Sequence, residues 1–150
     1  MTTDTFHLEW RGRIENRALN ALHAEAFGHG VVDDDWGAQL RAHSLGWVCA
    51  WDRTGALVGF VNVPWDGGCH AFILDTIVGA TARRQGLGTA MVRLAADKAR
   101  EAGCEWLHVD FDDQLRAFYW SACGFTTTSA GLINLKASSP GRQVEPGTRW

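Results

Sequence analysis

The hydrophobic pattern of this chain changes period abruptly at Gly86, and that change is the strongest constraint on its fold. Residues 70–78 form an apolar run rich in β-branched side chains, as buried strands do. From Gly86 onward, apolar residues recur at helical spacing, at Leu87, Ala90, Met91, Leu94, Ala95 and Ala99. A buried strand that leads directly into an amphipathic helix indicates an α/β protein.

The same two periods alternate along most of the chain, without an internal repeat. Apolar runs predict strands at residues 6–10, 46–51, 57–63, 70–78, 106–111 and 131–135. Helical stripes predict helices at residues 18–27, 36–40, 86–102 and 115–122, with Gly28 and Gly103 as C-terminal stops. We therefore predict one α/β (α+β) domain over residues 1–150, with a polar tail from about residue 138.

Charge and composition exclude several classes of partner. The net charge is −3 and no Lys/Arg run occurs, so a nucleic acid partner is not expected. The chain lacks both a secretory signal and an apolar span of about 20 residues, so no membrane association is expected. Its cysteines stand in or beside apolar runs without a C-x-x-C pair, which indicates reduced thiols and a cytoplasmic location.

The junction at residues 78–90 has the composition of an anion site. The first turn of a helix leaves N–H groups unpaired, and Gly86 and Gly88 remove side chains that would keep an anion away. Arg83 and Arg84 add guanidinium groups that match phosphate oxygens, so a diphosphate would fit. Glycines at such a junction also serve close packing. Neither G-x-x-x-x-G-K-[ST] nor G-x-G-x-x-G is present, which disfavours nucleoside triphosphates and dinucleotides.

Two motifs in this half of the chain resemble signatures of the GNAT superfamily of acyl-CoA-dependent N-acyltransferases. The pattern R-x-x-G-x-G at residues 83–88, after a strand that ends at Val78, is similar to the family's [RQ]-x-x-G-x-[GA] acyl-CoA loop. The segment A-F-Y-W-S-A-C-G-F at residues 117–125 is similar to its late signature. The resemblance covers about residues 57–135 and implies a mixed, splayed β-sheet flanked by helices. Coenzyme A would lie between the fourth and fifth strands.

The resemblance also implies which residues bind acetyl-CoA as cosubstrate. Main-chain groups at the strand end would hold the pantetheine, and amides at the helix start, with one arginine beside them, would hold the pyrophosphate. The implied pantetheine contacts are Ile77 and Val78, and the implied pyrophosphate contacts are Arg83, Arg84, Gln85, Gly86, Leu87, Gly88 and Thr89. The sequence departs from the family pattern at Asp112 and Leu115, where Asn and Ala are common, so a side-chain contact to the cofactor arm is in question.

Aminolysis of a thioester needs a neutral amine, a polarised carbonyl and a proton for the leaving thiolate. Tyr119, the one tyrosine, falls at the family's thiolate-protonating position, although an aromatic residue on an amphipathic helix is commonly part of the core. Asp75, the one carboxylate in an apolar strand run, is the candidate base, with a solvated or structural role as the alternative. His70, His108 and Asp110 are weaker candidates. His108 and Asp110 share a strand face, and water can replace a dedicated base.

Acidic and aromatic residues suited to a cationic amine occur at residues 33–36 and 64–66. Helix capping and core packing explain these residues as well. No histidine or cysteine spacing matches a metal site, so no metal is expected. No nucleophile motif is present either, which favours direct transfer over a covalent intermediate.

We therefore predict an N-acetyltransferase that moves an acetyl group from acetyl-CoA to a primary amine of a small molecule or peptide. The alternative is a non-catalytic acyl-CoA-binding sensor that keeps the phosphate loop. A dinucleotide-binding oxidoreductase would need a longer βαβ fingerprint than the chain contains. The sequence leaves open the acceptor, the acyl chain length and whether the chain forms a homodimer.

Overall fold

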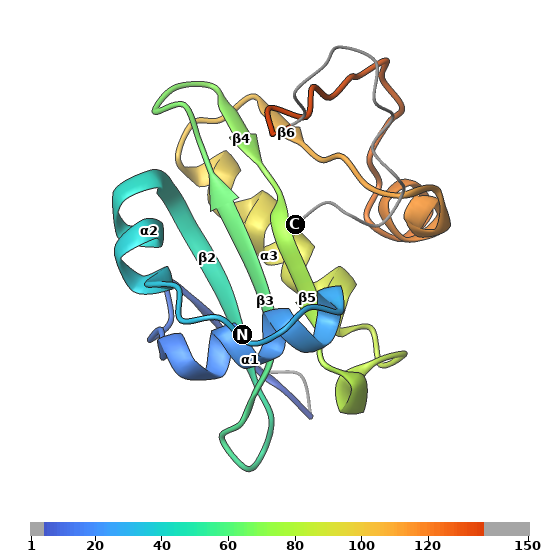
Figure 1. Ribbon diagram of the computed structural model, residues 1–150. Coiled ribbons are helices and arrows are strands. Elements are labelled where there is room, and N and C mark those ends of the chain that lie inside the picture. Colours follow the sequence, from blue (N-terminus) through green and yellow to red (C-terminus); the bar gives the residue numbers. More distant parts are fainter. Residues whose placement is uncertain (1–4, 137–150) are drawn as a thin grey trace. The chain divides into compact units, whose positions relative to one another are not determined.

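The computed structural model describes residues 5–136 (Figure 1). The described part divides between Val109 and Asp110 into two compact units, and each is described by itself below. The polar tail predicted from about residue 138 lies outside the described residues.

The main sheet of the first unit is antiparallel and has the strand order β1-β2-β3-β5. Its strands are β1 (His7–Trp10), β2 (Ser44–Trp51), β3 (Leu57–Pro64) and β5 (Leu74–Val78). The predicted hairpin between β2 and β3 is confirmed, with Val48 opposite Val61. Its turn is closed by Asp52, whose Oδ1 accepts hydrogen bonds from the N–H groups of Thr54 and Ala56 at 2.8 and 3.0 Å.

Three helices of the first unit match the predicted stripes: α1 (Asn16–Phe27), α2 (Trp36–His43) and α3 (Leu87–Glu101). The predicted stop of α1 is confirmed, because Gly28 adopts the left-handed conformation with φ 68° and donates to Ala24 O. Gly103 follows α3 with φ 89°.

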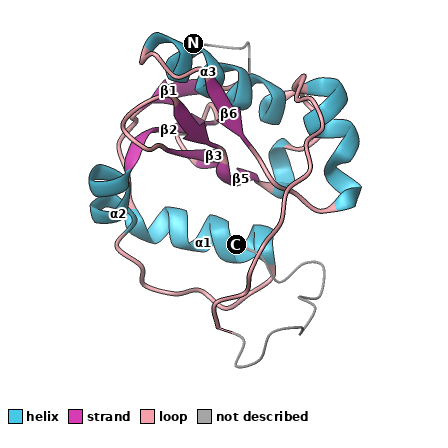
Figure 2. Ribbon diagram, turned by 90° about the horizontal axis from the view of Figure 1, so that it is seen from above, coloured by secondary structure: helices cyan, strands magenta, loops and turns pink. Residues whose placement is uncertain are grey.

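The helices cover both faces of the main sheet, α1 and α2 on one face and α3 on the other (Figure 2). Phe60 of β3 packs into a cluster with Leu19, Trp36 and Leu40 of the first two helices. Its neighbour Gly59 faces α3, where a Cβ would lie 2.8 Å from Met91 Sδ. β3 is therefore buried on both faces, which explains its continuous apolar run.

The strand predicted at residues 70–78 is not continuous. β4 (His70–Phe72) pairs in parallel with β6 (Trp106–His108), whereas β5 pairs with β3 in the main sheet. The last bond on the β6 side runs from Ile73 N–H to His108 O at 2.8 Å. The two sheets separate at this point, which agrees with the mixed, splayed sheet that the resemblance implied.

The second unit differs from the prediction in two respects. In place of an α-helix at residues 115–122, the chain forms a 3₁₀ turn (Asp113–Leu115) and a π-helical segment (Ala117–Ala122). The strand predicted at residues 131–135 is wrong, because this segment has no strand partner within residues 5–136. Its apolar side chains are exposed, with Leu132 at 61% and Ile133 at 84%, so apolar composition alone did not make a strand here.

Candidate functional site

The predicted anion loop lies where β5 ends and α3 begins. After Val78 the chain forms a 3₁₀ turn (Ala80–Ala82) and reaches Gly86, which precedes α3 with φ 75°. The first helical bond runs from Ala90 N–H to Gly86 O at 3.1 Å. The amides of the first turn have no intrahelical acceptor and are the groups that bind phosphate at helix ends: Leu87, Gly88 and Thr89.

The polar side chains of this loop lie at its surface. Arg83, Arg84 and Gln85 are exposed, and Arg84 has a left-handed φ of 60°. Arg83 Nε donates to Val78 O at 3.3 Å, and Gln85 Nε2 donates to Thr81 O at 3.2 Å. The Arg83 guanidinium therefore lies beside the end of β5, where pantetheine is predicted to bind.

Hydrogen bonds to two neighbouring elements, α1 and β3, hold the loop in place. Ala80 N–H donates to Glu25 Oε1 of α1 at 3.0 Å, and Gly79 N–H donates to Val58 O of β3 at 2.7 Å. A Cβ at Gly79 would lie 3.2 Å from that carbonyl oxygen, so glycine allows the close approach. Because the loop is already ordered, little conformational entropy is lost when its amides bind an anion.

One edge of β5 is open to a ligand, because β5 pairs only with β3 among the described strands. Ile77 is 1% exposed, so its side chain serves the core and only its main chain can meet a ligand. The neighbouring Thr76 Oγ1 is buried and has no hydrogen-bond partner within residues 5–136. A buried hydroxyl of this kind is costly, so a polar ligand group beside it would be stabilised.

Asp75 is the second residue of β5, just after the break at Ile73. Its φ of 52° is unusual for a residue other than glycine, and the pairing of β5 with β3 shifts register here. Asp75 Oδ1 lies 3.3 Å from Nε2 of His23 in α1, and the two side chains are 11% and 9% exposed. The structural partner considered as an alternative therefore exists. No sequence signal pointed to His23, which is 52 residues from Asp75 along the chain and is not part of any motif.

Tyr119 belongs to the second unit, in the π-helical segment, and is 5% exposed. Its ring stacks on Phe111 with centroids 4.7 Å apart and meets Phe118 and Phe125 edge-on. These contacts fix the orientation of the ring and therefore of its hydroxyl. They fit the core role considered for Tyr119 and are compatible with a catalytic one.

The acidic run before α2 acts as a helix cap. Asp35 Oδ1 accepts a hydrogen bond from Ala38 N–H at 3.0 Å, and this bond, with one from Asn16, lowers the pKa of the Asp35 carboxyl. Trp36 is 6% exposed, and its Nε1 donates to Asn20 Oδ1 at 3.1 Å. Local roles thus account for two of the residues considered for an acceptor pocket.

The turn after β3 is closed by Asp66, which accepts hydrogen bonds from the N–H groups of Gly68 and His70 at 2.7 and 3.2 Å. These bonds lower the pKa of the Asp66 carboxyl. Ligand-type atoms of Asp66, Cys69 and His70 lie within 4.8 Å of one another, a spacing outside the usual zinc motifs. This cluster does not test whether a metal binds, and the absence of a metal stays a prediction.

The weaker base candidates lie at the β4–β6 pair. His70 Nδ1 and His108 Nε2 are 2.8 Å apart, and the His108 ring stacks on Phe72 with centroids at 4.8 Å. Because β6 ends at His108, Asp110 is not on the strand, and the predicted shared face of His108 and Asp110 is wrong.

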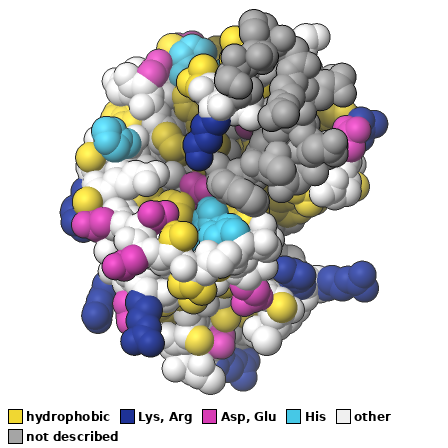
Figure 3. Space-filling model, viewed as in Figure 1, with side chains coloured by type: hydrophobic (Ala, Val, Ile, Leu, Met, Phe, Trp, Pro, Cys, Tyr) yellow, Lys and Arg dark blue, Asp and Glu magenta, His cyan; other side chains and the backbone are white. Residues whose placement is uncertain are grey.

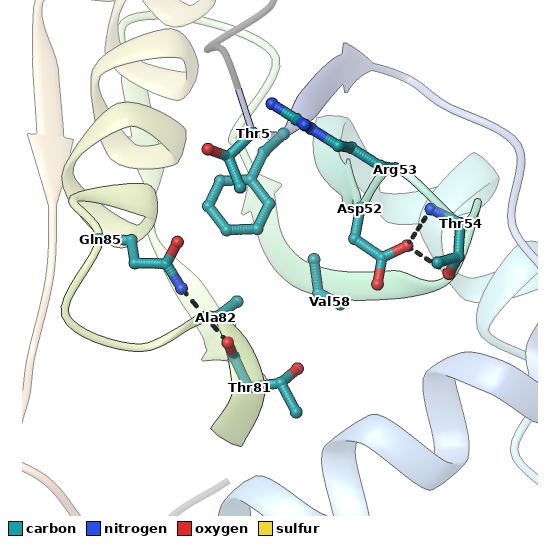
Figure 4. A pocket seen from close by; sticks show the side chains of 9 residues that line it. Thr5, Asp52, Arg53, Thr54, Val58, Thr81, Ala82 and Gln85 are labelled. Carbon is teal, nitrogen blue, oxygen red and sulfur yellow. Dashed lines mark hydrogen bonds between the residues drawn. The ribbon is translucent and has the colours of Figure 1, made fainter.

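A small pocket of about 240 Å³ lies beside the anion loop (Figure 4). The β2–β3 turn lines one side of it, and Thr81, Ala82 and Gln85 line the other. This volume is below the range of about 300–1,000 Å³ typical of small-molecule sites. The helix end and the open β5 edge, rather than this pocket, form the candidate cofactor site.

Surface charge, the character of the helices and the cysteines bear on which partners and mechanisms suit the site. On the face shown in Figure 3, acidic and basic side chains are interspersed among the described residues. Within residues 5–136, the helices lack the length and apolar character that a bilayer crossing requires. All four cysteines are free, and burial raises the pKa of the Cys49 thiol to about 12, which makes it a poor nucleophile.

Comparison with protein families agrees with the motifs. The model of the acetyltransferase (GNAT) family matches residues 6–125. A probable glucosamine 6-phosphate N-acetyltransferase 2 of Oryza sativa subsp. japonica is 42% identical over 59 residues, which are 39% of this chain and 35% of that protein. The match thus spans about a third of the length of that relative.

Solved structures share the fold. A putative acetyltransferase from Deinococcus radiodurans has a TM-score of 0.72 and 20% identity, covering 90% of this chain and 94% of that one. The GNAT family N-acetyltransferase YhbS from Escherichia coli, solved in complex with CoA, has a TM-score of 0.64 and 20% identity, covering 84% of this chain and 73% of that one.

Proposed function

The chain belongs to the acetyltransferase (GNAT) family, and on that premise we propose that it transfers an acetyl group from acetyl-CoA directly to a primary amine. One observation carries the proposal: three amides without an intrahelical acceptor lie at the start of α3, which follows the end of β5, and one edge of β5 has no strand partner within residues 5–136. A helix end of this kind suits a diphosphate, and an open strand edge suits an extended amide chain. Acetyl-CoA contains both.

The residues of this structure fit that cosubstrate. The amides of Leu87, Gly88 and Thr89 would hold the pyrophosphate, with the guanidinium of Arg83 as counter-charge. The main chain of Ile77 and Val78 would bind the pantetheine, and a polar ligand group would satisfy the buried Thr76 hydroxyl. Bound acetyl-CoA supplies the activated acyl carbon that the amine attacks.

Two side chains of the protein would then accept and donate the protons of the reaction. Asp75 is a largely buried carboxylate two residues from Ile77 on the same strand, and it would accept a proton from the acceptor ammonium. Tyr119, whose ring is held by three aromatic contacts, would donate a proton to the departing thiolate. The raised pKa of Cys49 argues against that thiol as the site of an acyl-cysteine intermediate.

Both units take part in this proposal as one domain, because the family match at residues 6–125 includes segments on both sides of the division at Val109. The free state of the four cysteines supports a reducing compartment such as the cytoplasm. The name of the rice relative supports an amino sugar phosphate as one acceptor to test.

Amine-dependent release of CoA thiol tests the proposal. Acetyl-CoA is offered with a panel of primary amines: glucosamine 6-phosphate, spermidine, n-propylamine and a peptide with a free N-terminus. We expect at least one amine to raise the release rate above hydrolysis. Acetyl-CoA that binds tightly in calorimetry but supports no amine-dependent release would favour the sensor instead, and NAD in parallel serves as the negative ligand.

A further inference from the structure

We propose that His23 and His29 extend Asp75 into a proton relay that conducts the proton of the acceptor ammonium toward solvent. The relay rests on the proposed function, and it assigns roles to two histidines that sequence reasoning did not single out. His23 and His29 act through Asp75 and are therefore positioning residues.

The three side chains form one continuous series of hydrogen bonds. Asp75 Oδ1 lies 3.3 Å from His23 Nε2, His23 Nδ1 lies 2.7 Å from His29 Nε2, and His29 Nδ1 lies 2.6 Å from Gly30 O. α1, which carries His23, lies beside β5, which carries Asp75 (Figure 1). Every nitrogen of both imidazole rings takes part in the series.

The chemistry of these atoms fixes how many protons the series holds. Gly30 O can only accept, so His29 Nδ1 carries a proton. One proton must also lie between the two rings, and another between His23 and Asp75, because each of those links otherwise joins two acceptors. The fully bonded series therefore contains one proton more than two neutral imidazoles and a carboxylate.

That extra proton is the one the reaction must remove. Before transfer, the Asp75 carboxylate faces a neutral His23, and one link lacks its proton. A proton taken from the ammonium completes the series, and the hydrogen bond between the rings lets the charge move from His23 to His29. The unit thus stabilises the proton it accepts.

The surroundings suit this task. His23 is 7% exposed, with Phe27 and Trp36 at ring distances of 4.5 and 5.3 Å, so water is largely kept from the inner link. The left-handed Gly28 ends α1 and brings His29, which is partly exposed, back beside His23. The series therefore runs from a largely buried carboxylate to a ring that water can reach.

The overall proton balance requires such an exit. A primary ammonium and acetyl-CoA give an amide, CoA thiol and one free proton: the N–C bond forms and the C–S bond breaks. Of the two protons that nitrogen loses, one ends on the thiol sulfur. The other leaves through Asp75, His23 and His29.

The test compares two nucleophiles in single-turnover acetyl transfer at saturating acetyl-CoA. n-Propylamine is mostly ammonium near neutral pH, as a lysine amine is, whereas hydroxylamine is mostly neutral and needs no such proton removal. His29→Gln should slow transfer to n-propylamine by at least about tenfold and leave the rate of transfer to hydroxylamine nearly unchanged. The loss should not exceed the roughly 10²–10⁴-fold rate contribution of a general base. His43→Gln, an exposed histidine at the end of α2, is the matched control. An equal loss with both nucleophiles, or no loss, would overturn the relay.

A second measurement needs no turnover. Ring ¹⁵N spectra of wild type and Asp75→Asn should differ at His29, although Asp75 and His29 are joined only through His23. Identical His29 shifts in the two proteins would overturn the relay. A wild type that acetylates neither nucleophile would instead count against the proposed function, and the ring spectra would then decide the relay alone.

Discussion

The start of α3 and the break between β4 and β5 are built in opposite ways. The first is made of backbone amides from consecutive residues, ordered by a left-handed Gly86. The second brings the side chain of Asp75 against His23, from a helix 52 residues earlier in the chain. A backbone site depends little on which side chains surround it, whereas a side-chain site depends on single atoms.

This difference separates binding from chemistry. Changes at the strand break should lower the rate of acetyl transfer and spare acetyl-CoA affinity. Changes at the helix start should do the reverse. A substitution at the strand break that weakened acetyl-CoA binding, or one at the helix start that slowed transfer at saturating acetyl-CoA, would show that the two regions are not independent.

The largest effect is expected for Asp75→Asn. Asparagine tolerates the left-handed conformation that Asp75 adopts, so the fold should persist. The amide cannot accept a proton, so single-turnover transfer should fall by roughly 10²–10⁴-fold. Acetyl-CoA affinity measured by calorimetry should stay within error of wild type. A weakened affinity would contradict the separation of binding from chemistry.

Tyr119→Phe should come next. The substitution keeps the ring that packs on Phe111 and removes one hydroxyl, so the melting temperature should change little. A positioned general acid is worth roughly 10²–10⁴, and we expect the lower end, about 10²-fold, because a CoA thiol already leaves readily. The measurement is the chemical step across pH at saturating acetyl-CoA. Equal rates in both proteins would remove Tyr119 as the acid.

Arg83→Glu acts on the other region. Loss of charge-assisted hydrogen bonds worth about 1.5–3 kcal/mol should weaken acetyl-CoA binding roughly 10- to 100-fold. The rate at saturating acetyl-CoA should be nearly normal. Arg93→Glu, an exposed arginine in α3, is the matched control. Equal affinities of the two variants would argue against a phosphate beside Arg83.

The smallest effect concerns the local cap of α2. Hydrogen bonding from Ala38 holds the folded pKa of Asp35 below its unfolded value of 3.8, so its stabilising effect exists above that value and is lost as pH falls through the folded pKa. Asp35→Ala should lower the melting temperature by at most about 2–4 °C at pH 7, and the difference should shrink in acid. A constant difference from pH 7 to pH 2 would mean that the carboxylate charge contributes nothing.

The features that the sequence predicted correctly are those that depend on residues close together in the chain. α1, α3 and the β2–β3 hairpin follow from local periodicity and turn residues, and the glycine at α3 is visible in the sequence because it is part of the motif. The break at Ile73 was not predicted, because residues 71–74 are apolar on both sides of it and only the pairing with β6 and β3 divides the run between two sheets. His23 was missed for the same reason: its partner is set by how α1 packs, not by spacing.

The most direct measurement is mass spectrometry of products formed from acetyl-CoA with a deuterated acetyl group, offered with the same panel of amines. We expect an amide that carries the deuterium label, formed in step with free CoA and formed roughly 10²–10⁴-fold more slowly by Asp75→Asn. Acetyl-CoA that binds at wild-type affinity while every amine in the panel stays unlabelled would contradict acetyl transfer and leave an acyl-CoA-binding protein.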